Sequence, residues 1–362
     1  MDGLRDVVAA ETVLSDVDGA KGQLIIRGYA LDELAGRSSF EEAAHLLLEG
    51  MIEGLPEAAE FGGRLGEARA RVFLEVSALD RELAGRPPLD AVRALMARLP
   101  DGDDLEVALS LLAAPAVFTA AAIRVGQGLA PVSPDPRLGH AADMLRMLKN
   151  APAAPGEAAA LDAYLVTIVD HGLNASTFAA RVAASTLAGL TSAALAGISA
   201  LKGPLHGGAP GPVIDMLDAI GSPEHAVQWL EAALDRGDRL MGFGHGVYRV
   251  RDPRADALKR AVQGLAQASP ELPGRLALAE AVEAAALDIL KRRKPNRPLN
   301  TNVEFYTAVL LEALGFPHGA FTCVFASGRI AGWLAHAREQ VISGRLIRPS
   351  SRYVGPMPRE AA

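Results

Sequence analysis

The segment GPLHGGAPGPVIDML (203–217), followed after a polar helix by DRGDRLMGFGHGVYRVRDPR (235–254), decides how the rest of this chain is interpreted. It contains His206 and His245, each followed directly by glycine, and it ends on Arg254. Glycine beside histidine lets a ligand approach the backbone. Histidine exchanges protons near neutral pH, and arginine binds carboxylates and phosphates through paired hydrogen bonds. The segment therefore predicts a site that binds a small polycarboxylate and transfers protons.

Two plainer interpretations of this segment stay open at this point. A histidine followed by glycine can simply mark the end of a helix. The loop GFGHG (242–246) also resembles a phosphate-binding glycine loop. That loop follows the charged residues DRGDRLM and not a β-branched strand, so a dinucleotide-binding fold is disfavoured.

The composition favours a mostly helical enzyme-sized chain. Its 362 residues are enough for about two domains. Half of the residues are hydrophobic, many of them alanine and leucine, whereas aromatic residues make up only 5%. Such a composition favours helices over an all-β or doubly wound α/β fold. The net charge of −7 and the lack of a dominant basic face argue against a nucleic-acid partner.

The cysteine content and the hydropathy argue against disulfides, a cysteine-based zinc site and membrane-spanning segments. The single cysteine, Cys323, cannot form a disulfide framework or a zinc site, and its apolar neighbours predict a buried thiol. The N-terminus has no apolar signal core, and we expect no stretch long and apolar enough to span a membrane. Residues 182–201 are apolar, but they include five serines and threonines. We therefore expect a cytoplasmic protein.

Only residues 12–27 carry a clear β pattern, two short apolar runs around Asp16–Gly19 that predict a hairpin. After it, Ser39 followed by two glutamates predicts a capped helix. Amphipathic helices are expected over 54–99, and one long apolar helix is expected over 104–128.

Two long helices are expected between residues 161 and 200, and more between 254 and 314. The polar run DHGLNAST (170–177) interrupts an apolar stretch, and buried polar groups need partners. Helix capping by Asn174 or Ser176 is one explanation, and a binding role for His171 is the other.

Two further features have a structural and a functional interpretation. The run KRRKPNRP (291–298) is either a solvated basic turn or a phosphate-binding segment. Glu304 falls in the first turn of a predicted helix over 300–314. A carboxylate there either complements the helix dipole or acts as a base.

The chain resembles the citrate synthase family, including the closely similar 2-methylcitrate synthases. The resemblance extends from the N-terminal hairpin to YVGP (353–356), which is nearly the whole chain. It is carried by SDVDGAKGQLIIRGY (15–29), DHGLNASTF (170–178), GPLHGGA (203–209), MGFGHGVYRVRDPR (241–254), NVEFY (302–306), GRIAGW (328–333) and RLIRPSS (345–351).

The resemblance implies a mostly α, two-domain helical fold with a small N-terminal β-hairpin, assembled as a homodimer. The large domain would comprise residues 1–206 and 315–362, and the small domain residues 207–314. The active site would lie in the cleft between them and close over oxaloacetate, which excludes water from the thioester intermediate.

The family's reaction is a Claisen-type condensation of acetyl-CoA with oxaloacetate, followed by thioester hydrolysis. It uses no metal and no permanently bound cofactor, since CoA enters and leaves as a co-substrate. By motif, Glu304 occupies the position of the base that takes a proton from the methyl carbon. His206 would stabilise the enol, and His245 would polarise the ketone of oxaloacetate.

The resemblance also implies the ligand contacts. His171, Arg254 and Arg329 would bind oxaloacetate, joined by Arg348 from the partner subunit. The remaining candidates concern CoA: the backbone of the loop would meet the adenine, and cationic side chains would meet the phosphates. These candidates are Gly242, Phe243, Gly244, Arg249, Lys291 and Lys294, and the two lysines rest on the basic run alone.

The chain departs from the family pattern at Glu304, where aspartate is usual. The added methylene moves the carboxylate by about 1 Å, and catalysis is sensitive to shifts of that size. Three functions therefore stay open. They are a citrate synthase, a 2-methylcitrate synthase that uses propionyl-CoA, and a weakly active regulatory relative that binds CoA or citrate.

Overall fold

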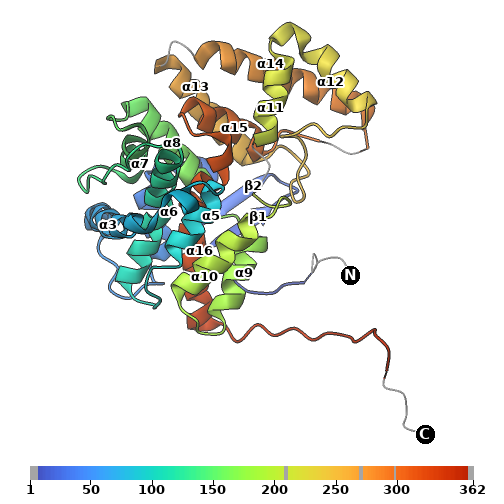
Figure 1. Ribbon diagram of the computed structural model, residues 1–362. Coiled ribbons are helices and arrows are strands. Elements are labelled where there is room, and N and C mark those ends of the chain that lie inside the picture. The colour runs from blue at the N-terminus through green and yellow to red at the C-terminus, as the bar shows by residue number, and fades with distance from the viewer. Residues whose placement is uncertain (1–6, 208–210, 269–271, 297–298, 358–362) are drawn as a thin grey trace.

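The computed structural model describes residues 7–207, 211–268, 272–296 and 299–357. These residues form sixteen α-helices, α1 to α16, and one small antiparallel sheet of three strands (Figure 1). The mostly α fold with an N-terminal hairpin is thereby confirmed.

The predicted hairpin is present, and one short strand extends it. β1 (Ser15–Asp18) pairs with β2 (Gln23–Ile26), which pairs with β3 (Tyr29–Ala30). Alternate residues of β2, Leu24 and Ile26, are buried and attach the sheet to the helical core. The third strand was not predicted, because two residues are too few to show a strand pattern.

The first half of the chain forms eight helices around a buried centre. Ser39 caps α2 as predicted, because its hydroxyl accepts from the Glu42 amide while the Glu42 carboxylate accepts from the Ser39 amide. The elements are α1 (Leu31–Leu34), α2 (Phe40–Leu48), α3 (Ala58–Val72), the 3₁₀ helix η1 (Phe73–Ala78), α4 (Arg81–Ala84), α5 (Pro88–Met96), α6 (Leu105–Gly126), α7 (His140–Lys149) and α8 (Pro155–Thr167).

Helix α6 corrects one expectation from the sequence. Over Leu105–Gly126 it is long and apolar enough, by length and composition, to cross a membrane. In the fold, 89% of its most apolar window is buried inside the protein, between α3, α5, α7 and α16. That burial is what the central helix of a packed core shows.

The stretch 161–200 contains three helices and not the predicted two. α8 ends at Thr167, and α9 (Ala175–Ala184) and α10 (Leu190–Leu201) follow. The break contains the polar run, where Gly172 takes a φ of +59° and Asn174 caps α9 by accepting from the amides of Ser176 and Thr177. The capping interpretation of Asn174 is confirmed, and the break leaves His171 on an irregular loop.

A second group of helices lies above the first in Figure 1. It comprises α11 (Gly211–Ile220), the 3₁₀ helix η2 (Pro223–His225), α12 (Ala226–Asp235), α13 (Pro253–Ala268), α14 (Leu272–Arg293) and α15 (Val303–Ala313). α13 packs against α8 of the first group and against α15 of its own group. The two groups therefore meet along α13, whose N-terminal end carries Arg254.

The chain then returns to the first group. After the 3₁₀ helix η3 (His318–Ala320), α16 (Phe321–Ser343) runs through the core and packs against α6, α9 and α10. It contains the predicted buried thiol of Cys323. Beyond α16, residues 344–357 are extended and leave the helical body (Figure 1).

Candidate active site

The loops after α8 and before α13 bring two histidines and one tyrosine together. The rings of His171 and His245 have centroids 5.9 Å apart in an edge-on arrangement. The Tyr248 hydroxyl lies 3.1 Å from His171 Nε2, and its ring also contacts His245. Burial and the nearby cation of Arg254 lower the pKa of His171 well below its usual value, so this histidine is neutral at pH 7.

Local hydrogen bonds fix the tautomer of His245. Its Nδ1 accepts from the amides of Val247 at 3.0 Å and Tyr248 at 3.1 Å, so the proton of the neutral ring resides on Nε2. Burial, followed by the charge of Arg254, lowers the pKa of His245 to about 4. Arg254 Nη2 lies 3.2 Å from that Nε2. Two donors thus face the same place, where a ligand oxygen could accept from both.

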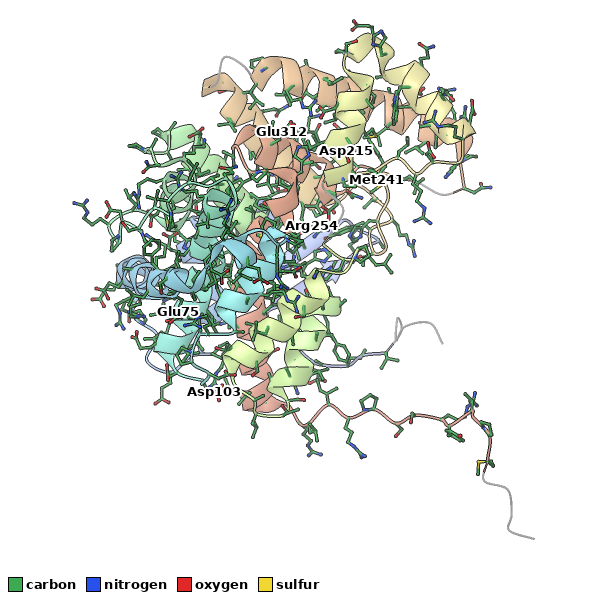
Figure 2. All side chains as sticks on the ribbon, viewed as in Figure 1. Glu75, Asp103, Asp215, Met241, Arg254 and Glu312 are labelled. Atoms are coloured by element: carbon green, nitrogen blue, oxygen red, sulfur yellow. The ribbon has the colours of Figure 1, made fainter. Side chains whose placement is uncertain are left out.

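Arg254 is held by a carboxylate that also anchors α15. The guanidinium donates to both oxygens of Asp252, at 3.0 and 2.8 Å, and only 3% of Arg254 is exposed. Asp252 Oδ2 additionally accepts from the amide of Val303, the first residue of α15. This bond ties the arginine to the helix that bears Glu304. In Figure 2 the labelled Arg254 lies where the two helix groups meet.

Arg329 supplies a second cation from α16. It is 1% exposed, and its Nε donates to the carbonyl of Ile168 at 2.6 Å. Its Nη2 is buried and has no hydrogen-bond partner among the described residues. Burial lowers the pKa of Arg329 to about 10, which leaves it charged at neutral pH. A buried cationic donor without a partner points to an anionic ligand.

Glu304 lies half-buried in the first turn of α15, where Asn302 caps the helix by accepting from the Glu304 amide. Burial raises the pKa of its carboxyl to about 7, and Asp252 adds to the rise, while Arg254 and Arg329 oppose it. The charges of both arginines therefore reach this carboxyl. A carboxyl with a pKa near neutrality suits proton abstraction.

His206 contacts a serine that the sequence had suggested only as a helix cap. Its Nε2 lies 2.7 Å from Ser176 Oγ, which also accepts from Trp333 Nε1 and lies 2.8 Å from Asn174 Oδ1. Burial, with Arg329 nearby, lowers the pKa of His206 to about 4, so the ring is neutral. The Ser176 hydroxyl has one proton, and Asn174 Oδ1 and His206 Nε2 are its two possible acceptors. In the arrangement in which it donates to Nε2, the His206 proton resides on Nδ1, where it can face a ligand.

We expect Ser176→Ala to lower turnover by roughly tenfold to a hundredfold, because the His206 tautomer loses its partner. The KM for the dicarboxylate should change little, since Arg254 and Arg329 are untouched. The matched control is Thr186→Val, which removes a hydroxyl just after α9 that donates to the local Ala183 carbonyl at 2.7 Å. Equal turnover of Ser176→Ala and the parent enzyme would show that this contact does not orient His206.

A cavity of about 380 Å³ opens beside Glu304 and His245. Its wall includes the predicted glycine loop and Lys294, in the set Leu234, Asp238, Arg239, Leu240, Met241, Gly242, Phe243, Gly244, His245, Gly246, Leu290, Lys294, Leu299, Asn302 and Glu304. Lys291 and Lys294 also line an adjoining cavity of about 360 Å³. A larger cavity, of about 710 Å³, lies between α1, α8 and α13, but no site histidine or Glu304 lines it.

The basic run after α14 divides into two parts. Arg292 and Arg293 both pair with Glu231 of α12, so they stabilise helix packing. Lys291 and Lys294 are exposed beside the cavities, and Arg297 lies outside the described residues. The sequence could not separate these cations, because the pairing depends on a helix about sixty residues earlier.

Two predicted ligands lie apart from the cluster of buried site side chains. Arg249 is exposed on the loop after His245, where its amide donates to the carbonyl of Gly19 at 2.8 Å. Arg348 is exposed in the extended segment after α16. Figure 1 shows that segment leaving the helical body. Among the described residues, no group of three or more histidine, cysteine, aspartate or glutamate side chains could hold a metal ion.

Comparison with known proteins identifies the class. The family model described as citrate synthase, C-terminal domain, matches residues 3–350. Citrate synthase of Haloferax volcanii is 38% identical over 98% of this chain and 95% of its own length, and 2-methylcitrate synthase of Mycobacterium tuberculosis is 35% identical over 98% and 90%. The structure of Thermoplasma acidophilum citrate synthase in a ternary complex with carboxymethyl coenzyme A and oxaloacetate has a TM-score of 0.84 at 31% identity, covering 99% of this chain and 97% of that one.

The fold, the site and these similarities define a citrate synthase-type acyltransferase. The chain belongs to the citrate synthase family.

Proposed function

We propose that the protein condenses acetyl-CoA with oxaloacetate to give citrate and CoA. One observation carries the proposal: a carboxyl with a pKa of about 7, Glu304, lines a cavity with His245 and lies within the field of two buried arginines. A carbon acid needs a positioned base and donors for the developing oxyanion. Proton abstraction beside a bound dianion is the chemistry that this combination suits.

Oxaloacetate would bind between the two arginines. Arg254 and the unpartnered Nη2 of Arg329 would take its carboxylates, and His171, held by Tyr248, would add a further hydrogen bond. The Nε2 proton of His245 would then donate to the ketone oxygen, beside Arg254. Because His171 and His245 are neutral, they act only as hydrogen-bond donors. The positive charge that attracts the dianion comes from the arginines.

The reaction would proceed through an enol or enolate. Glu304 takes a proton from the methyl carbon of acetyl-CoA while His206 donates to the thioester oxygen. The new carbon–carbon bond forms at the ketone carbon of oxaloacetate, and His245 stabilises the alkoxide. Water then hydrolyses the thioester, which releases CoA and the new carboxylate. The protein needs no permanently bound cofactor for these steps, because CoA enters and leaves as a co-substrate.

CoA would occupy the cavity of about 380 Å³. The backbone of Gly242, Phe243 and Gly244 would meet the adenine, since Gly242 and Gly244 have positive φ and no side chains in the way. Lys291 and Lys294, at the adjoining cavity, and Arg249 would meet the phosphates. A carboxymethyl coenzyme A complex of a related citrate synthase supports a CoA site in this fold.

We also propose a homodimer with a cleft that closes. The large domain would contain residues 1–206 and 315–362, and the small domain residues 207–314, which meet along α13. The extended segment after α16 exposes Leu346, Tyr353 and Val354, and exposed apolar side chains on an unpacked segment favour a second copy as partner. Arg348 would then reach the partner's site. The setting would be the cytoplasm and the tricarboxylic acid cycle.

Mixing variants tests the shared site. Homodimers of Arg348→Ala and of His245→Ala should each lose most activity. After subunit exchange, heterodimers should regain activity, because one of their two sites receives both intact residues. No recovery after verified exchange would show that each site is built from one chain.

The identity of the acyl group that the enzyme transfers distinguishes two candidate functions, and 2-methylcitrate synthase is the second of them. Relatives of both kinds are similar to this chain at 38% and 35% identity. A single methylene in a binding pocket changes the free energy by which an enzyme discriminates two substrates by only about 1–3 kcal/mol. Measuring kcat/KM for acetyl-CoA and propionyl-CoA at saturating oxaloacetate decides between them. A clear preference for propionyl-CoA would overturn the proposal, and no turnover with either would favour the regulatory relative.

A further inference from the structure

The N-terminal hairpin contacts both loops that carry the site histidines. Its first strand contacts the loop of His171, and its turn contacts the loop after His245. These loops come from different helix groups and are about 75 residues apart in the chain. The hairpin has no other role in the proposed reaction, so these contacts need an explanation.

At the first contact, Ser15 joins β1 to the residues on either side of His171. Its hydroxyl donates to Asp170 Oδ2 and accepts from the amide of Gly172 at 3.0 Å. The same Asp170 oxygen lies 3.2 Å from Nε2 of buried His336 on α16. The backbone around His171 is therefore held between the hairpin and the core helix.

At the second contact, Gly19 lies directly against the backbone after His245. Its carbonyl accepts from the Arg249 amide at 2.8 Å. A Cβ on Gly19 would lie 2.4 Å from the carbonyl oxygen of Val247, closer than side-chain carbons approach. The φ of Gly19 is not positive, so alanine there would be strained only by this contact.

The second contact involves the same backbone segment, 247–249, that holds His245. The amides of Val247 and Tyr248 are the donors that hold His245 Nδ1, and Tyr248 also contacts His171 through its hydroxyl. A shift of the backbone at Val247 would therefore change the orientation of His245 and the contact with His171 together.

We propose that the hairpin positions the two histidines, with Ser15 and Gly19 as positioning residues that act through His171 and His245. This inference rests on the proposed function for its kinetic consequence. Misplacement of a reacting group by about 1 Å can lower rates on the order of a hundredfold. A hairpin that only packs on the core would leave the site geometry unchanged when its turn is altered.

The test compares Gly19→Ala with Lys21→Ala in the full-length protein. Lys21 is in the same turn, but its side chain is 76% exposed and pairs only with Asp18 among the described residues. We expect Gly19→Ala to raise the KM for oxaloacetate and to lower kcat/KM on the order of a hundredfold. Lys21→Ala should match the parent. Ser15→Ala should show a smaller loss of kcat/KM. It replaces Gly19→Ala in the comparison if Gly19→Ala folds poorly.

A readout independent of activity separates this inference from the proposed function. Nitrogen NMR of labelled histidines reports the tautomer of His245, with His245→Gln used for assignment. Gly19→Ala should alter the His245 signals, whereas Lys21→Ala should not. Unchanged His245 signals in Gly19→Ala, together with unchanged His171 signals in Ser15→Ala (assigned with His171→Gln), would overturn the inference, even if the parent enzyme is active. Where Gly19→Ala does not fold, unchanged His171 signals in Ser15→Ala overturn it. If the parent fails to bind oxaloacetate in calorimetry, the proposed function fails, and the NMR comparison still decides the role of the hairpin.

Discussion

Glu304→Gln should lose at least about a hundredfold in turnover, the lower end of what a positioned base contributes. The amide keeps the size and the hydrogen-bonding capacity of the side chain but cannot accept the methyl proton. Oxaloacetate binding should change little, since Arg254 and Arg329 hold that ligand. Hydrogen–deuterium exchange from the methyl group of acetyl-CoA, or of an unreactive analogue, measures proton abstraction directly. If the variant exchanges that proton as fast as the parent, Glu304 is not the base.

The same residue should determine the pH profile. Burial raises the pKa of Glu304 to about 7, and only the ionised form accepts a proton. The kcat/KM of the parent enzyme for acyl-CoA should therefore rise with pH below 7 and level off above it. The profile of Glu304→Gln should lack this rise. The histidines cannot cause it, because the pKa values of His206 and His245 are lowered to about 4.

Arg329→Gln should weaken oxaloacetate binding by about 2–5 kcal/mol, or roughly thirtyfold to several thousandfold, because a buried carboxylate would lose its charged partner. Titration calorimetry measures the effect without acyl-CoA. Arg338→Gln is the matched control: Arg338 lies on the same helix and its Nε also donates to a backbone carbonyl, that of Met51. Equal oxaloacetate affinity in the two variants would remove Arg329 from the site.

The sequence predicted the parts of the site that are held by short, ordered motifs. His206, His245, Arg254 and Glu304 could be proposed as site residues because glycine neighbours, paired arginines and a helix start are local signals. The hairpin and the cap at Ser39 were predicted for the same reason. The structure brings His171, His245 and Arg254 together, as the motifs required.

What the sequence missed depends on contacts between distant segments. Tyr248 was not singled out from the sequence, and only the fold places its hydroxyl beside His171. Ser176 was considered as a helix cap, and its contact with His206 depends on how α9 and the loop after α10 meet. Asp252 was part of a sequence motif. It contacts both Arg254 and the first residue of α15 only because α13 and α15 pack together.

The expected pair of long helices over 161–200 was wrong for a related reason. The polar run 170–177 interrupts the apolar stretch, but a polar interruption does not by itself show that the backbone turns there. The break is set by Gly172 at positive φ and by the capping bonds of Asn174. That break is also what frees His171 to face the site. His171 therefore lies in a segment whose structure the local sequence pattern predicts poorly.

The most direct test of the account is product formation from oxaloacetate and acetyl-CoA labelled with ¹³C in its methyl group. Thiol release and product mass are followed together, with reactions that lack oxaloacetate as the control. The account predicts that thiol release requires oxaloacetate and yields citrate carrying the label. Thiol release that is the same without oxaloacetate, or oxaloacetate-dependent release without labelled citrate, would contradict it.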